Sequence, residues 1–162
     1  MPIRFKAQEI FKIAIRSEEN ASQFYRQAAT IFKDSSQSKV FLTLAEMEDT
    51  HQKTFTKLAN EFIDNGSEQP VYDPFNEAEL YLQALGDYQG GEGSIKFVTI
   101  TANQRLLDVI DLAIELEKKS ILFYVGLKGF VPDDLGKEKI DFIIEEEKKH
   151  LMQLAQLRFK NA

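Results

Sequence analysis

The tetrapeptide EKKH at residues 147–150 and its counterpart EDTH at residues 48–51 contain both histidines of the chain. In each tetrapeptide a glutamate precedes the histidine by three residues. Residues i and i+3 share one face of an α-helix, so Glu147 and His150 point the same way, as do Glu48 and His51. Each tetrapeptide therefore predicts a helix that presents one carboxylate and one imidazole together.

An internal duplication relates the two tetrapeptides, which begin 99 residues apart. The same separation relates Glu117 to Glu18 and Tyr124 to Tyr25. In both copies the tyrosine follows the glutamate by seven residues, which again keeps the two on one helical face. We therefore interpret the chain as two copies of a helical hairpin that agree at their polar positions.

Each of the four glutamates lies in the apolar stripe of a predicted helix. Apolar residues recur around it at alternating steps of three and four, which marks the face that an amphipathic helix buries. This periodicity favours buried carboxylates over the alternative, a duplicated hairpin that kept its surface charges. In chain order the stripes are Phe11, Ala14, Glu18, Ala21, Tyr25, Ala28 and Phe32; Phe41, Leu44, Glu48, His51, Phe55, Leu58 and Phe62; Ile110, Ala113, Glu117, Ser120, Tyr124, Leu127 and Val131; and Ile140, Ile143, Glu147, His150, Leu154 and Leu157.

Four glutamates and two histidines in core positions need compensating charge, because burying an unpaired charge is very costly. Two divalent cations would supply it, since four carboxylates carry −4 and two such ions carry +4. The hairpins are expected to turn near Ser35 and Pro132. A rise of about 1.5 Å per residue places the ligands of both hairpins roughly 20–27 Å from their turn. All six groups can therefore meet in one layer.

The composition fits a single helical domain over residues 1–162. With 43% hydrophobic residues the chain can fill one core. The lack of cysteine excludes disulfides, thiolate metal sites and a cysteine nucleophile. A net charge of −6 without a basic cluster argues against a nucleic-acid partner. No signal peptide and no uncharged apolar run long enough for a membrane is present, so we expect no membrane contact and a cytoplasmic location.

Capping and turn residues set the expected helix bounds. The first hairpin is expected over about residues 5–64, with its turn at residues 34–36. The second hairpin is expected over about residues 102–160, and Thr101 and Gln104 have the spacing of a capping box at its start. Asp133 or Asp134 is expected to cap its second helix.

A long crossover over residues 65–101 is expected to join the hairpins. Asn76 and Glu79 have capping-box spacing, which predicts a short helix over Asn76–Leu85. The glycine-rich residues 86–93 match no phosphate-binding fingerprint and follow no strand, so we interpret them as part of a flexible connection. Two helical hairpins joined by one long crossover predict an all-α, ferritin-like four-helix bundle.

Histidine and carboxylate ligands without thiolates favour iron or manganese over copper(I), and ligand type alone leaves zinc open. Two Glu-x-x-His helices and one glutamate from each of two others form the di-metal carboxylate arrangement of such bundles. The combined pattern resembles the rubrerythrins of the ferritin-like superfamily over the four helices. The eight residues that carry the resemblance are Glu18, Tyr25, Glu48, His51, Glu117, Tyr124, Glu147 and His150.

This resemblance implies two iron ions, with manganese or a mixed pair as alternatives. It implies that Glu48 and Glu147 bridge the ions. The remaining ligands would bind one ion each, namely Glu18 and Glu117 from the sides and His51 and His150 as caps. Tyr25 and Tyr124 would donate hydrogen bonds to ligand carboxylates, although they could also be plain core aromatics. Small side chains would leave room for the ions at Ala14, Ala21, Ala113 and Ser120.

The chain departs from many rubrerythrins in two ways. It lacks the cysteines of a rubredoxin-like domain, so electrons would come from a separate donor such as a rubredoxin-type protein. Rubrerythrins also carry an extra glutamate one turn after the ligand of the third helix, which supports an iron shift during peroxide reduction. Here that position is Ser120.

The resemblance predicts a di-iron oxidoreductase that reduces hydrogen peroxide or dioxygen. The main alternative is an iron-binding or ferroxidase-type protein with little turnover. A helical interaction module with a vestigial site is disfavoured, because six ligands are retained. Exchange of hairpins through the long crossover would suit a homodimer.

Overall fold

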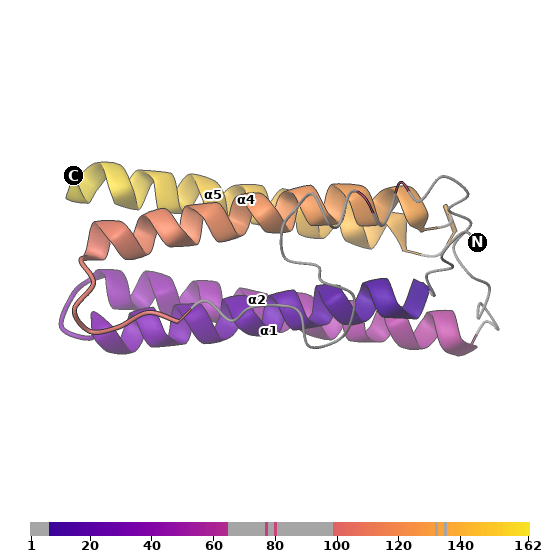
Figure 1. Cartoon of the computed structure of the whole chain (residues 1–162), viewed down its shortest axis with the longest axis horizontal. Helices are drawn as coiled ribbons and strands as arrows, with labels where there is room; N and C mark the ends of the chain where they lie inside the picture. Colours follow the sequence, from indigo (N-terminus) through magenta and orange to yellow (C-terminus); the bar gives the residue numbers. More distant parts are fainter. Residues whose placement is uncertain (1–6, 65–76, 78–79, 81–98, 132, 135) are drawn as a thin grey trace.

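The computed structural model describes residues 7–64, 77, 80, 99–131, 133–134 and 136–162, which contain four long α-helices (Figure 1). They are α1 (Ala7–Ile31), α2 (Gln37–Asp64), α4 (Leu106–Phe130) and α5 (Lys137–Asn161). No strand occurs within these ranges, and no helix in them is long and apolar enough to cross a membrane. The predicted all-α four-helix bundle is confirmed. The short helix expected over residues 76–85 falls largely outside the described residues.

The four helices form two antiparallel hairpins that face each other. α1 pairs with α2 and α4 pairs with α5, while α1 also contacts α4 and α2 also contacts α5. The turn of the first hairpin lies at one end of the bundle and the turn of the second at the other end (Figure 1). α2 therefore ends at the opposite end from the start of α4. The predicted crossover over residues 65–101 falls largely outside the described residues.

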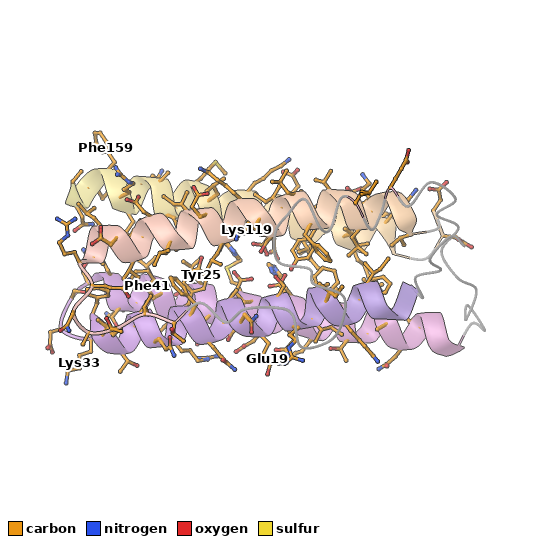
Figure 2. The ribbon with its side chains drawn as sticks, in the orientation of Figure 1. Glu19, Tyr25, Lys33, Phe41, Lys119 and Phe159 are labelled. Atoms are coloured by element: carbon orange, nitrogen blue, oxygen red, sulfur yellow. The ribbon has the colours of Figure 1, made fainter. Side chains whose placement is uncertain are left out.

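The core consists of two apolar clusters, one toward each end of the bundle. The first contains Phe11 and Phe55 from one hairpin and Leu127 and Ile140 from the other. The second contains the following residues, among others: Tyr25, Phe41, Ile110 and Leu154. Figure 2 shows Tyr25 and Phe41 between the helices, whereas Phe159, which is 85% exposed, projects from the surface. The apolar residues that recur at steps of three and four in the sequence are thus buried, as expected.

Side chains near the helix ends differ in part from the sequence prediction. The Gln104 side chain accepts a hydrogen bond from the Thr101 backbone N–H at 2.9 Å, but α4 begins only at Leu106, because these residues close a separate turn. Neither Asp133 nor Asp134 caps α5, so that prediction is wrong. The residue before α5 is Gly136 with φ of 107°, a left-handed conformation that glycine adopts without steric cost.

Candidate metal centre

Six ionisable side chains form a polar layer between the two apolar clusters. α1 supplies Glu18, α2 supplies Glu48 and His51, α4 supplies Glu117, and α5 supplies Glu147 and His150. Each of the six is at most 2% exposed. The periodicity that buries the flanking apolar residues also turns these groups inward. The structure brings together all six residues predicted as ligands, and metal binding by them stays a prediction.

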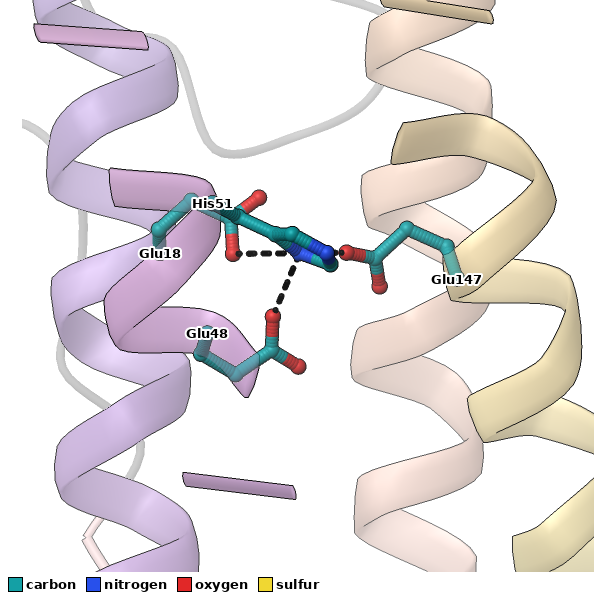
Figure 3. A group of neighbouring side chains, drawn as sticks. All are labelled: Glu18, Glu48, His51 and Glu147. Atoms are coloured by element: carbon teal, nitrogen blue, oxygen red, sulfur yellow. Dashed lines mark hydrogen bonds and ion pairs between the residues drawn. The ribbon is translucent and has the colours of Figure 1, made fainter. Parts of the chain in front are cut away.

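The first group of ligand atoms surrounds the imidazole of His51 (Figure 3). Its Nδ1 atom lies 3.6 Å from Glu18 Oε2, 3.1 Å from Glu48 Oε2 and 2.8 Å from Glu147 Oε1. Glu18 and Glu48 belong to the same hairpin as the histidine, whereas Glu147 reaches it from α5. One ligand atom from each of the four residues lies within 4.8 Å of the others. One ion with metal–ligand bonds of about 2.0–2.5 Å can span that separation.

The second group surrounds the imidazole of His150. Its Nδ1 atom lies 3.3 Å from Glu48 Oε1, 3.7 Å from Glu117 Oε2 and 3.6 Å from Glu147 Oε2. Ligand atoms of these four residues also lie within 4.8 Å of one another. Glu48 and Glu147 belong to both groups, each through two different oxygens. Two carboxylates that each offer one oxygen to either side can bridge a pair of ions. The imidazole rings stack at 5.6 Å between centroids.

Several polar atoms of this layer have no hydrogen-bond partner among the described residues. They are Glu48 Oε1, Glu117 Oε2, Glu147 Oε1, His150 Nδ1 and His150 Nε2. Glu147 Oε1 is one of them despite its short distance to His51, because that contact lacks hydrogen-bond geometry. Buried polar groups are normally paired, and each exception calls for an explanation such as a bound ion. The donor set is also chemically suited, since carboxylate oxygens and imidazole nitrogens are ligands for iron, manganese and zinc. These residues therefore fit a metal pair.

Two tyrosines connect the hairpins behind the ligands. The Tyr25 hydroxyl of the first hairpin donates a hydrogen bond to Glu117 of the second, and the Tyr124 hydroxyl donates one to Glu18. Both rings are fully buried. Burial, together with the nearby carboxylates, raises the pKa of both hydroxyls well above the usual value, so they keep their protons and act as donors. Their hydrogen bonds fix the orientation of the two carboxylates.

Crowding of four carboxylates changes their proton affinity in the metal-free protein. Burial, followed by the charge of Glu147, raises the pKa of Glu117 to about 8. Burial and the neighbouring carboxylates likewise raise the pKa of Glu48 well above its usual value. Burial pushes the pKa of Glu147 upward as well. Close contacts with Glu117 and with the two histidines outweigh burial there, and the pKa of Glu147 is lowered. The layer thus keeps protons on some carboxyl groups and charge on others.

The two histidines act as counter-charges in this metal-free layer. Burial alone lowers the pKa of an imidazole, but the three carboxylates around each ring outweigh it. They raise the pKa of His150 to about 12 and that of His51 well above its ordinary value. Two imidazolium groups therefore offset part of the carboxylate charge. A metal ion would have to displace these protons, because it binds neutral imidazole.

The four small residues expected beside the terminal glutamates are not all buried to the same extent. Ala14 and Ala113 are fully buried, whereas Ala21 and Ser120 are partly exposed. Ser120 therefore lies at the edge of the core on α4. It is within one turn of Glu117, as the stripe predicts.

Glu146 lies outside the apolar stripe of its helix and is not among the site residues predicted from the sequence. One oxygen of its carboxylate lies 2.7 Å from His51 Nε2, on the side of the ring that faces away from the ligand group. Glu146 directly precedes Glu147 on α5, and its side chain is 20% exposed. A residue next to a stripe position is rotated by about 100° on the helix, so it flanks the neighbouring helix. Attention to the residues that flank each ligand would have found it.

Comparisons with known proteins agree with this architecture. Among curated proteins, none matches the chain significantly. The chain is similar to a solved structure from Thermotoga maritima, provisionally described as a ferritin-like diiron-carboxylate protein. That match has a TM-score of 0.73 and 25% sequence identity, and it covers 100% of both chains. The family model for rubrerythrin matches residues 9–158. The chain therefore belongs to the rubrerythrin family.

Proposed function

We propose that this protein is a di-iron carboxylate oxidoreductase that reduces hydrogen peroxide or dioxygen with electrons from a separate donor protein. One observation carries the proposal, namely the two overlapping ligand groups that share Glu48 and Glu147. The rubrerythrin family match supports it. So does the similarity to a chain described as a diiron-carboxylate protein.

The layer would hold two ions with distinct roles for its residues. Glu48 and Glu147 would bridge them, while the other four ligands would bind one ion each. Four ionised carboxylates match the charge of two ferrous ions, so a loaded site would carry no excess charge in the core. Iron is favoured by the mixture of histidine and carboxylate ligands and by the family, and manganese is the main alternative.

Once bound, a pair of ferrous ions supplies two electrons, which together with two protons reduce one hydrogen peroxide to two waters. The chain itself holds the ligand carboxylates in position and excludes water from the site. Tyr25 and Tyr124 restrain the carboxylates of Glu117 and Glu18, so the ligand geometry persists when charge changes. The apolar clusters on either side keep bulk water away from the reacting atoms.

The oxidised site has to be reduced again before another turnover. This chain has no cysteine, so it carries no thiolate-bound redox centre that could deliver electrons. We propose that a separate electron carrier of the rubredoxin type supplies them.

A second candidate is an iron-binding or ferroxidase-type protein with little turnover. One position favours it. Rubrerythrins carry an extra glutamate one turn after the ligand of the third helix, and this chain has Ser120 there. A hydroxyl cannot stabilise the added charge of the oxidised pair as a carboxylate can.

Metal analysis followed by single-turnover oxidation tests the proposal. Protein purified without added metal should contain about two metal ions per chain, and anaerobic protein loaded with Fe²⁺ should consume about one peroxide for every two irons oxidised. Catalytic removal of peroxide in the presence of excess reductant then separates the enzyme from the iron-binding protein. The latter would complete one oxidation and stop.

Fewer than two ions per chain would refute the di-metal site. Two bound ions that do not react with either peroxide or dioxygen would refute the oxidoreductase and leave the metal site standing.

A further inference from the structure

The residues behind the two histidines break the symmetry of the duplicated site. The ligands repeat at a separation of 99 residues, and so do the tyrosines. Under that relation the counterpart of Glu146 is Met47. The two histidines therefore have ligand groups of the same composition on one side of the ring. On the other side, the residue that precedes the bridging glutamate is acidic in one copy and apolar in the other.

The hydrogen bonding of the two rings follows this difference. His51 Nε2 lies 2.7 Å from the Glu146 carboxylate. His150 Nε2 is buried and finds no hydrogen-bond partner in the described part of the chain. Met47 is partly buried and offers only a thioether, which is a weak acceptor. His51 thus has a hydrogen-bond partner at both ring nitrogens, Glu48 at Nδ1 and Glu146 at Nε2, whereas neither ring nitrogen of His150 has one among the described residues.

A carboxylate behind a ligating histidine has a known physical effect. It accepts the Nε2–H, which leaves the Nδ1 lone pair for the metal and fixes the rotation of the ring. Loss of such a partner typically costs about 10–100-fold in metal affinity. His51 has this support and His150 lacks it.

We infer that Glu146 is a positioning residue for His51, and that it makes the two metal positions unequal. The position formed by Glu18, Glu48, His51 and Glu147 binds its ion first and more tightly. The position that contains His150 fills second. This inference rests on the proposed binding of two metal ions, and it adds an order of loading that the duplication alone does not predict.

The duplication supplies reciprocal variants for the test. Glu146→Met gives the second copy the residue of the first, so neither histidine has a carboxylate behind it. Met47→Glu gives the first copy the residue of the second. Glu145→Met serves as a matched control, because Glu145 is an exposed carboxylate on the same helix and pairs only with Lys148 within the described chain. Circular dichroism melts of the metal-free variants verify that each one folds.

The measurement is a titration of metal-free protein with Zn²⁺, followed by calorimetry and by ¹⁵N NMR of the histidine rings. Zn²⁺ is diamagnetic and binds carboxylate and imidazole ligands. Wild type and Glu145→Met should bind two ions in separate steps, and the first equivalent should shift the His51 ring nitrogens before those of His150. Glu146→Met should weaken the first step by about 10–100-fold, while Met47→Glu should strengthen the second.

Three results would overturn the inference. One is an isotherm for Glu146→Met that matches wild type. Another is tighter first binding in Glu146→Met, which would mean that Glu146 serves only as a counter-charge for a protonated ring. A third is an NMR shift of His150 before His51 in wild type. Uptake of fewer than two ions by wild type would instead refute the proposed di-metal site itself.

Discussion

The metal-free protein should lose stability as the pH rises from about 5 to 8, because its polar layer binds protons more tightly in the folded state than in the unfolded state. Glu117 has a pKa of about 8 in the folded protein and an ordinary value of 4.5 when unfolded. The folded state therefore binds this proton more tightly. Its contribution to stability is complete below about pH 4.5 and is lost as the pH rises through 8. His150, with a pKa of about 12, acts in the same direction from about pH 6.5 upward.

The size of the effect follows from the difference in pKa. For Glu117 the difference is about 3.5, and at about 1.36 kcal/mol for each pH unit it amounts to about 5 kcal/mol. For a protein of this length, about 1 kcal/mol changes the melting temperature by about 2–4 °C. About three quarters of this contribution is lost between pH 5 and 8, so titration of Glu117 should lower the melting temperature by about 7–15 °C across this range. The lowered pKa of Glu147 acts in the opposite sense, but only below its ordinary value of 4.5.

Thermal melts of chelator-treated protein at pH 5, 6, 7 and 8 measure the change. Glu117→Gln imitates the protonated carboxyl and should flatten the dependence. Glu115→Gln is the matched control, because Glu115 is an exposed carboxylate on the same helix. A wild-type melting temperature that holds or rises over this range would refute the reasoning. So would a Glu117→Gln variant that declines as steeply as wild type.

Three further predictions concern single side chains. Glu147→Ala should lose most of the bound metal, because it removes a bridging carboxylate, whereas the exposed Glu46→Ala should keep it; equal metal content by elemental analysis would contradict the ligand assignment. Tyr25→Phe should destabilise the metal-free protein by about 1–3 kcal/mol in chemical denaturation, since a buried carboxylate loses its donor, and an unchanged midpoint would argue against that hydrogen bond. Ser120→Glu should speed single-turnover oxidation by peroxide by about tenfold at matched metal content, equivalent to about 1.4 kcal/mol at the barrier. A wild type that is already as fast would show that the hydroxyl is no handicap.

The bundle was predictable because its periodicity is strong and its copies agree. Apolar residues recur at steps of three and four around both Glu18 and Glu117, so the two copies independently predict the same buried face. Helix starts were less predictable, since capping residues also stabilise free turns. The Thr101–Gln104 contact forms such a turn ahead of α4, which begins at Leu106, and Gly136 precedes α5 where an aspartate was expected.

The proton distribution of the polar layer could not be predicted from the stripe alone. The stripe shows that carboxylates and imidazoles share one face. The stripe does not show the distances between these groups, which decide which of them keeps a proton. In the structure the histidines lie within 2.8–3.7 Å of the ligand carboxylates, close enough to hold protons and to lower the pKa of Glu147. Charge balance without metal therefore depends on packing geometry.

Neither hairpin contains a complete ligand group, because contacts from the opposite hairpin complete each one. Each ligand group takes three residues from one hairpin and one bridging glutamate from the other. Each tyrosine likewise donates its hydrogen bond to a glutamate of the opposite hairpin. Docking of the hairpins in another register would bury a bridging carboxylate, a terminal carboxylate and a tyrosine hydroxyl without these partners, at a cost of several kcal/mol. The polar layer therefore favours the docking of the two hairpins in the one register that completes both groups.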